Sequence, residues 1–235
     1  MSKIAIISDI HGNIFALEAV LTDISRHRGI EEILCLGDVV GYYPYPNECI
    51  ELVRDHCSIT IMGNHEAGVL GIEPPYYFNS VAYTMIVWTK KKLSEKNSDW
   101  IASLPKRRIV ERNKKSIYLV HGSPFKPFDY FDYEETDYFN KQLERAFNRT
   151  MTDIIMVGHT HIPVVMKFNK HKLFLNPGSV GQPRNGIPGA YYAIFNPATL
   201  KAKIVRVEYD FTPLQERVKE LKMPEILSER LNKGI

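Results

Sequence analysis

Lys3-Ile4-Ala5-Ile6-Ile7-Ser8-Asp9-Ile10-His11-Gly12-Asn13 is the stretch of sequence that decides the expected fold. Residues 3–8 are a short apolar run of strand length that leads into a polar loop. After this loop, apolar residues recur at spacings of three and four, at Ile14, Leu17, Leu21 and Ile24. That spacing is typical of an amphipathic helix. The stretch therefore predicts a strand, a polar loop and a helix, which is the first βα unit of a layered α/β protein.

Further short apolar runs continue this pattern along the chain. They lie at residues 31–36, 58–62, 116–120 and 153–157. Near-continuous apolar strands are typical of a sheet that is covered on both faces. Helices are expected over residues 46–56, 79–103 and 134–149. A charged, helical tail is expected from Thr212 onward.

The pattern changes after residue 160. The apolar runs VVMKFN, KLFLN, AYYAIFN and AKIVRVEY are separated by turns with Asn, Pro and Gly, and no gap is long enough for a helix. Such runs predict antiparallel hairpins. Early βα units followed by late hairpins indicate an α/β fold with two sheets.

Composition narrows the class of protein. The chain has 235 residues, of which 44% are hydrophobic and 24% charged, and its net charge is +3. These fractions are typical of a globular protein, and the small net charge gives no strong indication of nucleic-acid binding. The beginning of the chain is too polar for a signal peptide, and no apolar stretch reaches the ~20 residues of a membrane helix. Three cysteines without a CxxC pair indicate reduced thiols, so a cytoplasmic protein without membrane contact is expected.

Each of the five apolar runs before residue 160 ends in polar residues that can bind metal ions. These ends are Asp9-Ile10-His11, Gly37-Asp38, Gly63-Asn64-His65-Glu66, His121-Gly122-Ser123 and Gly158-His159-Thr160-His161. Ligand sites of open α/β sheets lie beyond the carboxyl ends of the strands. The five ends are therefore expected to meet in one crevice. The other three histidines, His27, His56 and His171, follow no such strand and are interpreted as surface or core residues.

The kinds of side chain at these ends indicate the kind of metal. Two Asp, one Asn and several His make an oxygen and nitrogen donor set without thiolate, which suits manganese, iron, zinc or nickel better than calcium. The set exceeds one tetrahedral site, and a carboxylate such as Asp38 can bridge two ions. As alternatives, Asp9 and Asp38 could be helix caps or turn formers. Glu66 could be structural and is left out of the ligand set.

In this order, D-x-H, G-D, G-N-H-E, H-G-S and G-H-T-H resemble the motifs of the calcineurin-like metallophosphoesterases. The resemblance implies one domain over residues 1–235, built as a four-layer α-β-β-α sandwich of two mixed sheets flanked by helices. It also implies two divalent ions, with manganese favoured over iron, zinc or nickel. The ligands implied for the first ion are Asp9, His11, Asp38 and His161. Those implied for the second are the bridging Asp38 together with Asn64, His121 and His159.

His65 is the one histidine of the five motifs that is not in that ligand set. It follows Asn64 and is expected to face the crevice, where it would serve as general acid to the leaving oxygen or stabilise the phosphoryl charge. The nucleophile would be a hydroxide held by the ions, so no Ser or Cys nucleophile is required.

The loop after Asp38 bears on the substrate. Gly41 and Tyr42 stand where the protein Ser/Thr phosphatase branch of the family has an Asp and an Arg, so that branch is disfavoured. G-Y-x-P-x-P-N-E and the later N-P-G-S-V-G-Q-P-R are similar to a compact bacterial and archaeal branch, some of whose members cleave dinucleoside polyphosphates or phosphodiesters. Arg184 and Tyr42 are assigned to substrate binding, Arg184 because its fork matches phosphate oxygens. The alternative for Arg184 is a surface residue in a turn.

Aromatic residues cluster in two loops near these motifs. They are Tyr76, Tyr77 and Phe78, and then Phe125, Phe128, Tyr130, Phe131 and Tyr133. Most are expected to pack in the core, and a few would form a wall that stacks a base. The predicted function is therefore hydrolysis of phosphodiester or phosphoanhydride bonds in small nucleotide-type substrates, with diadenosine tetraphosphate as the first candidate. The alternatives are a phosphomonoesterase or phosphodiesterase for another substrate, and a non-catalytic metal-binding scaffold. Homo-oligomerisation stays open.

Overall fold

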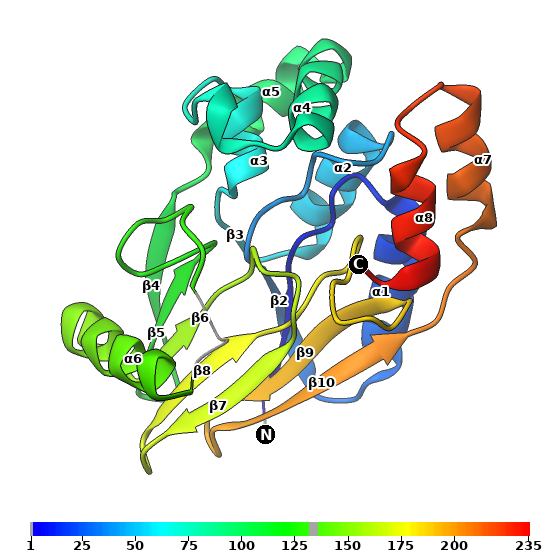
Figure 1. Ribbon diagram of the computed structural model, residues 1–235. Coiled ribbons are helices and arrows are strands. Elements are labelled where there is room, and N and C mark those ends of the chain that lie inside the picture. Colours follow the sequence, from blue (N-terminus) through cyan, green and yellow to red (C-terminus); the bar gives the residue numbers. More distant parts are fainter. Residues whose placement is uncertain (1, 132–135) are drawn as a thin grey trace.

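The computed structural model describes residues 2–131 and 136–235 and contains two five-stranded sheets packed face to face (Figure 1). The first sheet has the order β10-β9-β1-β2-β3. Its strands are β1 (Lys3–Ile7), β2 (Ile30–Cys35), β3 (Ile59–Thr60), β9 (Ala190–Asn196) and β10 (Lys201–Val207). β1, β2 and β3 are parallel, whereas β9 and β10 are antiparallel to their neighbours. This sheet is therefore mixed.

The second sheet is mixed as well and has the order β4-β5-β6-β8-β7. Its strands are β4 (Arg107–Arg112), β5 (Lys115–Val120), β6 (Ile154–Met156), β7 (Val164–Phe168) and β8 (Lys172–Asn176). β5, β6 and β8 are parallel, and β4 and β7 pair antiparallel at the two edges. The half of the chain after residue 160 is thus not purely antiparallel, because β8 joins β6 in parallel.

Helices cover the outer faces of both sheets and the edge where the parallel strands end (Figure 1). The helices are α1 (Ile14–Arg26), α2 (Pro46–His56), α3 (Asn64–Val69), α4 (Ser80–Lys92), α5 (Glu95–Ser103), α6 (Thr136–Thr150), α7 (Thr212–Glu220) and α8 (Ile226–Lys233), with a 3-10 turn η1 at Pro75–Tyr77. In the part of the chain that the structure describes, no helix is both long and apolar enough to span a bilayer.

The alternation of side chains along the strands creates the layers. In β1, Ile4 and Ile6 belong to the apolar cluster between the two sheets, whereas Ala5 and Ile7 belong to the cluster under the first helices. Successive side chains of a strand point to opposite faces, so an apolar strand must be covered on both sides. On the outer face of the second sheet, α6 adds Leu143 to a third cluster. The four-layer α-β-β-α sandwich expected from the sequence is confirmed.

One local expectation was wrong. The single helix expected over residues 79–103 is two helices, because the chain turns at Leu93 and the Ser94 hydroxyl caps α5 by accepting a hydrogen bond from the Asn97 amide. A capping serine begins a new helix even where apolar spacing continues. The strand β4 and the short helix α3 were not expected either. Residues 134 and 135 of the helix expected over 134–149 lie outside the described part of the chain.

Candidate metal centre

The loops that follow β1, β2 and β6 hold five predicted ligands in an unusual backbone conformation. Asp9, His11, Asp38, His159 and His161 all have positive φ values, between 52° and 66°. Non-glycine residues rarely adopt this left-handed region, at a cost of roughly 1–2 kcal/mol each. Hydrogen bonds between the loops hold it in place: the amides of Asp9 and His11 donate to the carbonyls of Gly37 and Asp38, at 3.0 and 2.9 Å. Such strain persists only where surrounding structure enforces it, and it concentrates at functional sites.

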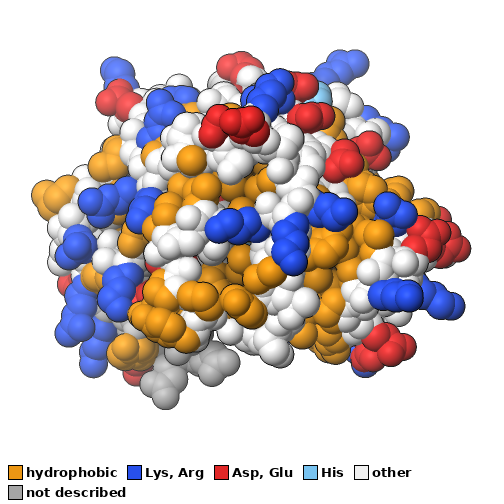
Figure 2. All heavy atoms as spheres, turned by 90° about the horizontal axis from the view of Figure 1, so that it is seen from above, with side chains coloured by type: hydrophobic (Ala, Val, Ile, Leu, Met, Phe, Trp, Pro, Cys, Tyr) orange, Lys and Arg blue, Asp and Glu red, His pale blue; other side chains and the backbone are white. Residues whose placement is uncertain are grey.

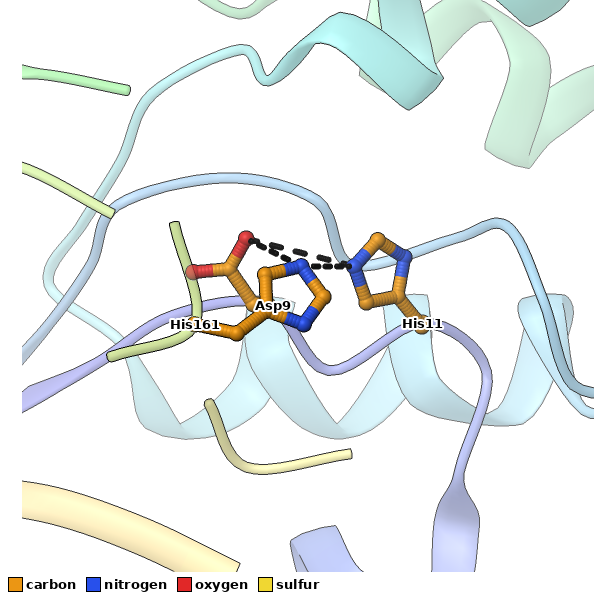
Figure 3. A group of neighbouring side chains, drawn as sticks. All are labelled: Asp9, His11 and His161. Carbon is orange, nitrogen blue, oxygen red and sulfur yellow. Dashed lines mark hydrogen bonds and ion pairs between the residues drawn. The ribbon is translucent and has the colours of Figure 1, made fainter. Parts of the chain in front are cut away.

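Asp9, His11 and His161 form the first group of potential metal ligands (Figure 3). The Nε2 atoms of His11 and His161 lie 3.1 Å apart. Asp9 Oδ1 lies 3.4 Å from His161 Nε2 and 3.9 Å from His11 Nε2. All three side chains are buried. Residues that are 150 positions apart in sequence thus point their donor atoms at one small volume.

Asp38 belongs to two further groups, one with His11 and His65 and one with His121 and His159. Its Oδ2 lies 3.1 Å from His121 Nε2 and 3.7 Å from His11 Nε2. This carboxylate therefore stands between the histidines of both halves of the site.

Asn64 completes the second half of the site. Its Oδ1 lies 3.0 Å from His121 Nε2. With it, the structure brings all seven predicted ligands together, including the single amide among them.

Hydrogen bonds decide which ring nitrogen of three histidines can bind a metal ion. His11, His121 and His161 each place Nδ1 against a backbone carbonyl, of Val40, Leu36 and Gln182 respectively. A carbonyl only accepts, so each Nδ1 carries a hydrogen, and Nε2 of His11 and of His161 then presents a lone pair to the centre. Nε2 of His121 faces the oxygens of Asn64 and Asp38 and carries a proton that a bound cation would displace. Two lone pairs that face each other at 3.1 Å repel, and a cation held by His11 and His161 would remove that repulsion. The donor set thus fits divalent transition-metal ions.

Burial shifts the pKa values of Asp9, His159 and His65 away from their ordinary values. It raises the pKa of Asp9 to about 7, with the nearby Asp38 adding to the effect. It lowers the pKa of His159 to about 3 and that of His65 to about 4. At His121 the carboxylates of Asp38 and Asp9 outweigh burial and raise the pKa to about 10. Two poorly hydrated carboxylates in one place are stabilised by any cation that binds there.

His65 faces the same centre but is held differently from the other histidines. Its amide donates to Asp38 Oδ1 at 2.8 Å, and its ring meets the His11 ring edge-on at 4.6 Å. Within residues 2–131 and 136–235, its buried Nδ1 has no hydrogen-bond partner. Gly41, at φ 136°, passes so close that an added Cβ would lie 2.4 Å from this nitrogen. Backbone packing, rather than a carboxylate partner, therefore orients the ring.

Glu66 is buried and has the structural role that the sequence allowed for it, although its partners were not predicted. Its carboxylate accepts hydrogen bonds from the amides of Asp38, Val40 and Gly63 at 2.9, 3.0 and 2.8 Å. It thereby ties the loop that carries Asp38 to the loop that carries Asn64. Its position directly after G-N-H was the only available signal, because its three partners are backbone groups that a sequence pattern does not identify.

The segment that contains N-P-G-S-V-G-Q-P-R supports the first loop and brings Arg184 to the site. The Ser179 hydroxyl donates to the Asp9 carbonyl at 2.7 Å, and an added Cβ on Gly181 would lie 1.9 Å from the Ile10 carbonyl oxygen. Arg184 lines the crevice and donates to the Tyr42 hydroxyl at 3.4 Å. Tyr42 also lines the crevice, yet only 2% of it is exposed. Its surface available to a substrate is therefore small.

A crevice of about 380 Å³ opens above this centre. Its rim carries Tyr77 and Tyr130, which are 66% and 63% exposed, together with Phe78 and Phe128. Hydrophobic side chains cover much of the middle of the face seen from above, with several Lys and Arg side chains among them (Figure 2). Two aromatic residues of each of the two predicted loops therefore line the crevice.

The remaining aromatic candidates do not line the crevice. Phe131 is 1% exposed and packs against Phe139 and Phe174, so it belongs to the core, the place expected for most of these aromatic residues. Tyr76 and Phe125 are exposed but lie outside the crevice lining. Tyr133 lies outside the described residues.

Comparisons with known proteins agree with this site. The sequence model of the calcineurin-like phosphoesterase superfamily domain matches residues 2–199. The uncharacterised protein MJ0912 of Methanocaldococcus jannaschii is 44% identical, over 99% of this chain and 98% of its own. A metallophosphoesterase structure from Sphaerobacter thermophilus is 34% identical with a TM-score of 0.82, covering 100% of this chain and 99% of that one. Phosphodiesterase YfcE of Escherichia coli is 26% identical, over 83% of this chain and 89% of its own.

Proposed function

Because the chain belongs to the calcineurin-like phosphoesterase superfamily, we propose that it is a metal-dependent hydrolase that cleaves phosphodiester or phosphoanhydride bonds in small nucleotide-type substrates. One observation carries this proposal: Asp38 is shared by two of the three groups of buried donors at the bottom of the crevice. A carboxylate shared in this way suits a pair of ions, which is the arrangement common to phosphatases and nucleases.

In this proposal the two halves of the site hold one divalent ion each. Asp9, His11, Asp38 and His161 would hold the first, and Asp38, Asn64, His121 and His159 the second. Manganese is the first candidate, with iron, zinc or nickel as alternatives, because the donors are oxygen and nitrogen without sulfur. When bound, such ions polarise a phosphoryl oxygen and lower the pKa of a water nucleophile toward neutrality.

The protein's own groups then bind and orient the substrate. His65 lines the crevice and would donate a hydrogen bond or a proton to the leaving oxygen. Arg184 would bind a non-bridging phosphoryl oxygen through its guanidinium, and Tyr42 would keep that guanidinium in place. The hydrogen bonds of Nδ1 to backbone carbonyls keep the ligand rings in one orientation.

The rim of the crevice supports a nucleotide as substrate. Tyr77 and Tyr130 expose large ring faces beside the donor groups, and a base stacked on such a face gains ~1–3 kcal/mol. The relative YfcE is named a phosphodiesterase, and this name agrees with cleavage at a phosphorus atom that carries two substituted oxygens. Diadenosine tetraphosphate has both bases and phosphoanhydride bonds, so it is the first substrate to test.

A panel of metals and substrates tests this function. The chelator-treated chain is loaded separately with Mn²⁺, Fe²⁺, Zn²⁺ and Ni²⁺ and assayed on bis-p-nitrophenyl phosphate and on diadenosine tetraphosphate, with products identified by mass spectrometry. We expect turnover with at least one metal and cleavage of the tetraphosphate into two nucleotides. No turnover with any metal would favour the alternative of a non-catalytic, metal-binding scaffold.

A further inference from the structure

The C-terminal helices α7 and α8 lie beyond residue 199, where the match to the family's domain ends. Leu214 and Val218 of α7 and Leu227 of α8 form an apolar cluster with Tyr42 and Tyr43. The Tyr43 hydroxyl also donates to the Leu227 carbonyl at 3.1 Å. The tail is therefore packed directly on the loop that follows Asp38, and it forms part of the surroundings of the crevice.

This packing brings a second guanidinium next to Arg184. Arg230 of α8 lies over the Tyr42 ring, with Cζ 5.5 Å from the ring centroid. Nη1 of Arg230 and Nη2 of Arg184 each lie 3.5 Å from the same atom, Oε1 of Gln182. The Gln182 side chain is buried, so this oxygen is a fixed point that both arginines share.

Neither guanidinium is neutralised by a carboxylate. Among residues 2–131 and 136–235, no Asp or Glu oxygen lies within 4.0 Å of Arg184 or Arg230. Glu229, the neighbour of Arg230, pairs with Lys233 at 3.0 Å instead. Two cations on one neutral amide oxygen repel each other, and an anion bound beside them removes that repulsion. Such an unpaired cationic pair is the expected recognition element for a phosphate-type anion.

The pair lies next to the donor groups at the bottom of the crevice. The Tyr42 ring that contacts Arg230 also contacts the rings of His11 and His65, with centroids 4.7 and 4.8 Å apart. Arg184 itself lines the crevice. An anion bound at Arg184 would therefore be an immediate neighbour of a phosphoryl group bound over the histidines and carboxylates.

We propose that Arg184 and Arg230 bind a second phosphoryl group of the substrate, adjacent to the one that is cleaved. Arg184 contacts this group, while Arg230 adds the second charge and holds Gln182 in place. This inference rests on the proposed function and narrows it: the substrate class is a phosphoanhydride with at least two phosphoryl groups, rather than a simple diester. It also gives the C-terminal helices a role in substrate selection.

Binding of inorganic anions tests the site without any reaction. The full chain, freed of divalent ions because polyphosphates chelate them, is titrated calorimetrically with tripolyphosphate and with orthophosphate. We expect tripolyphosphate to bind at least about tenfold more tightly. The Arg230→Met variant keeps an apolar stem on Tyr42 and should lose about tenfold in tripolyphosphate affinity, whereas Arg230→Lys should retain most of it.

The matched control is Lys233→Met, which removes the same charge from the same helix three residues away. It should leave both affinities unchanged. An equal loss in this control would mean a general charge effect and would overturn the inference, as would a wild-type chain without preference for tripolyphosphate. If Arg230→Met does not fold, Arg184→Met must show the same loss of preference, and an unchanged preference there also overturns the inference.

Hydrolysis separates this inference from the proposed function. In the manganese-loaded chain, Arg230→Met should raise KM for diadenosine tetraphosphate about tenfold more than it raises KM for bis-p-nitrophenyl phosphate. If neither compound is hydrolysed but the Arg230-dependent preference for tripolyphosphate persists, the proposed function fails and the anion site stands. If both are hydrolysed and the variant slows them equally, the function stands and the second-phosphoryl site is wrong.

Discussion

The bottom of the crevice and its rim are held in opposite ways. At the bottom, Asp9, His11 and Asp38 are buried, their backbones are in the left-handed region, and other loops bond to their main chain. At the rim, Tyr77 and Tyr130 are largely exposed. A metal centre needs donor atoms fixed to a fraction of an ångström, whereas substrate selection tolerates side chains that adapt. We infer that the bottom of the crevice determines the chemistry and the rim determines the substrate.

The largest expected effect comes from Asp38, which belongs to two donor groups. Asp38→Asn keeps the shape but removes the charge that would be shared by two ions, so metal content and turnover should be lost together. Metal analysis by mass spectrometry and the bis-p-nitrophenyl phosphate assay measure both. Asp129→Asn at the rim, whose partner is Lys126, is the control and should keep its metal. Full activity of Asp38→Asn would contradict the assignment of the site.

His65→Ala should separate catalysis from metal binding. The ring faces the centre but lies outside the proposed ligand set, so the variant should keep its metal and lose roughly 10²–10⁴-fold in kcat. The loss should be largest for substrates with poor leaving groups, which need the proton or hydrogen bond most. A series of aryl phosphodiesters with different leaving-group pKa measures this dependence. Loss of metal in His65→Ala, but not in the surface control His171→Ala, would instead make His65 a ligand.

Glu66→Gln tests whether the bottom of the crevice depends on its support. The Glu66 carboxylate accepts three backbone hydrogen bonds, and an amide would turn an N–H donor toward one of those amides. We expect metal affinity to fall by about 10–100-fold, as for other groups that support ligands indirectly. Competition with a chromogenic chelator measures it, with Glu73→Gln at the rim as control. Equal affinity in both variants would show that the loops keep their shape without this carboxylate.

The smallest effect on turnover is expected at Tyr130 and Phe131. These two adjacent residues lie at the rim and in the core, so they test the comparison most directly. Tyr130→Ala should raise KM for a nucleotide substrate by about tenfold through lost stacking and leave kcat unchanged, while Tyr130→Phe should keep most of the binding. Phe131→Ala should leave KM unchanged but lower the free energy of unfolding by about 3–5 kcal/mol, because its ring is in the core. Kinetics and thermal unfolding distinguish the two. A KM change in Phe131→Ala alone would reverse the assignment of rim and core.

The sequence allowed the main strands and the donor residues to be predicted because both leave local signals. Apolar runs of strand length mark β1, β2, β5 and β6, and these strands end one to three residues before Asp9, Asp38, His121 and His159. The break between α4 and α5 was missed, although Ser94 is a good cap, because the apolar spacing continues through it. The edge strand β4 was missed because its exposed residues, such as Ile109, give a weaker alternation.

The sequence by itself determined which residues carry donor atoms and in which strand-end loops they lie, because the strand pattern and the ligand types are local properties. Only the tertiary structure decided which of these atoms face each other, that Glu66 joins two loops, and that Tyr130 is at the rim while Phe131 is buried. It alone brought Arg230 from the C-terminal helix to Arg184, 46 residues earlier in the sequence. The physical reason is that packing two sheets and their helices sets distances between segments far apart in the chain, and no local pattern contains those distances.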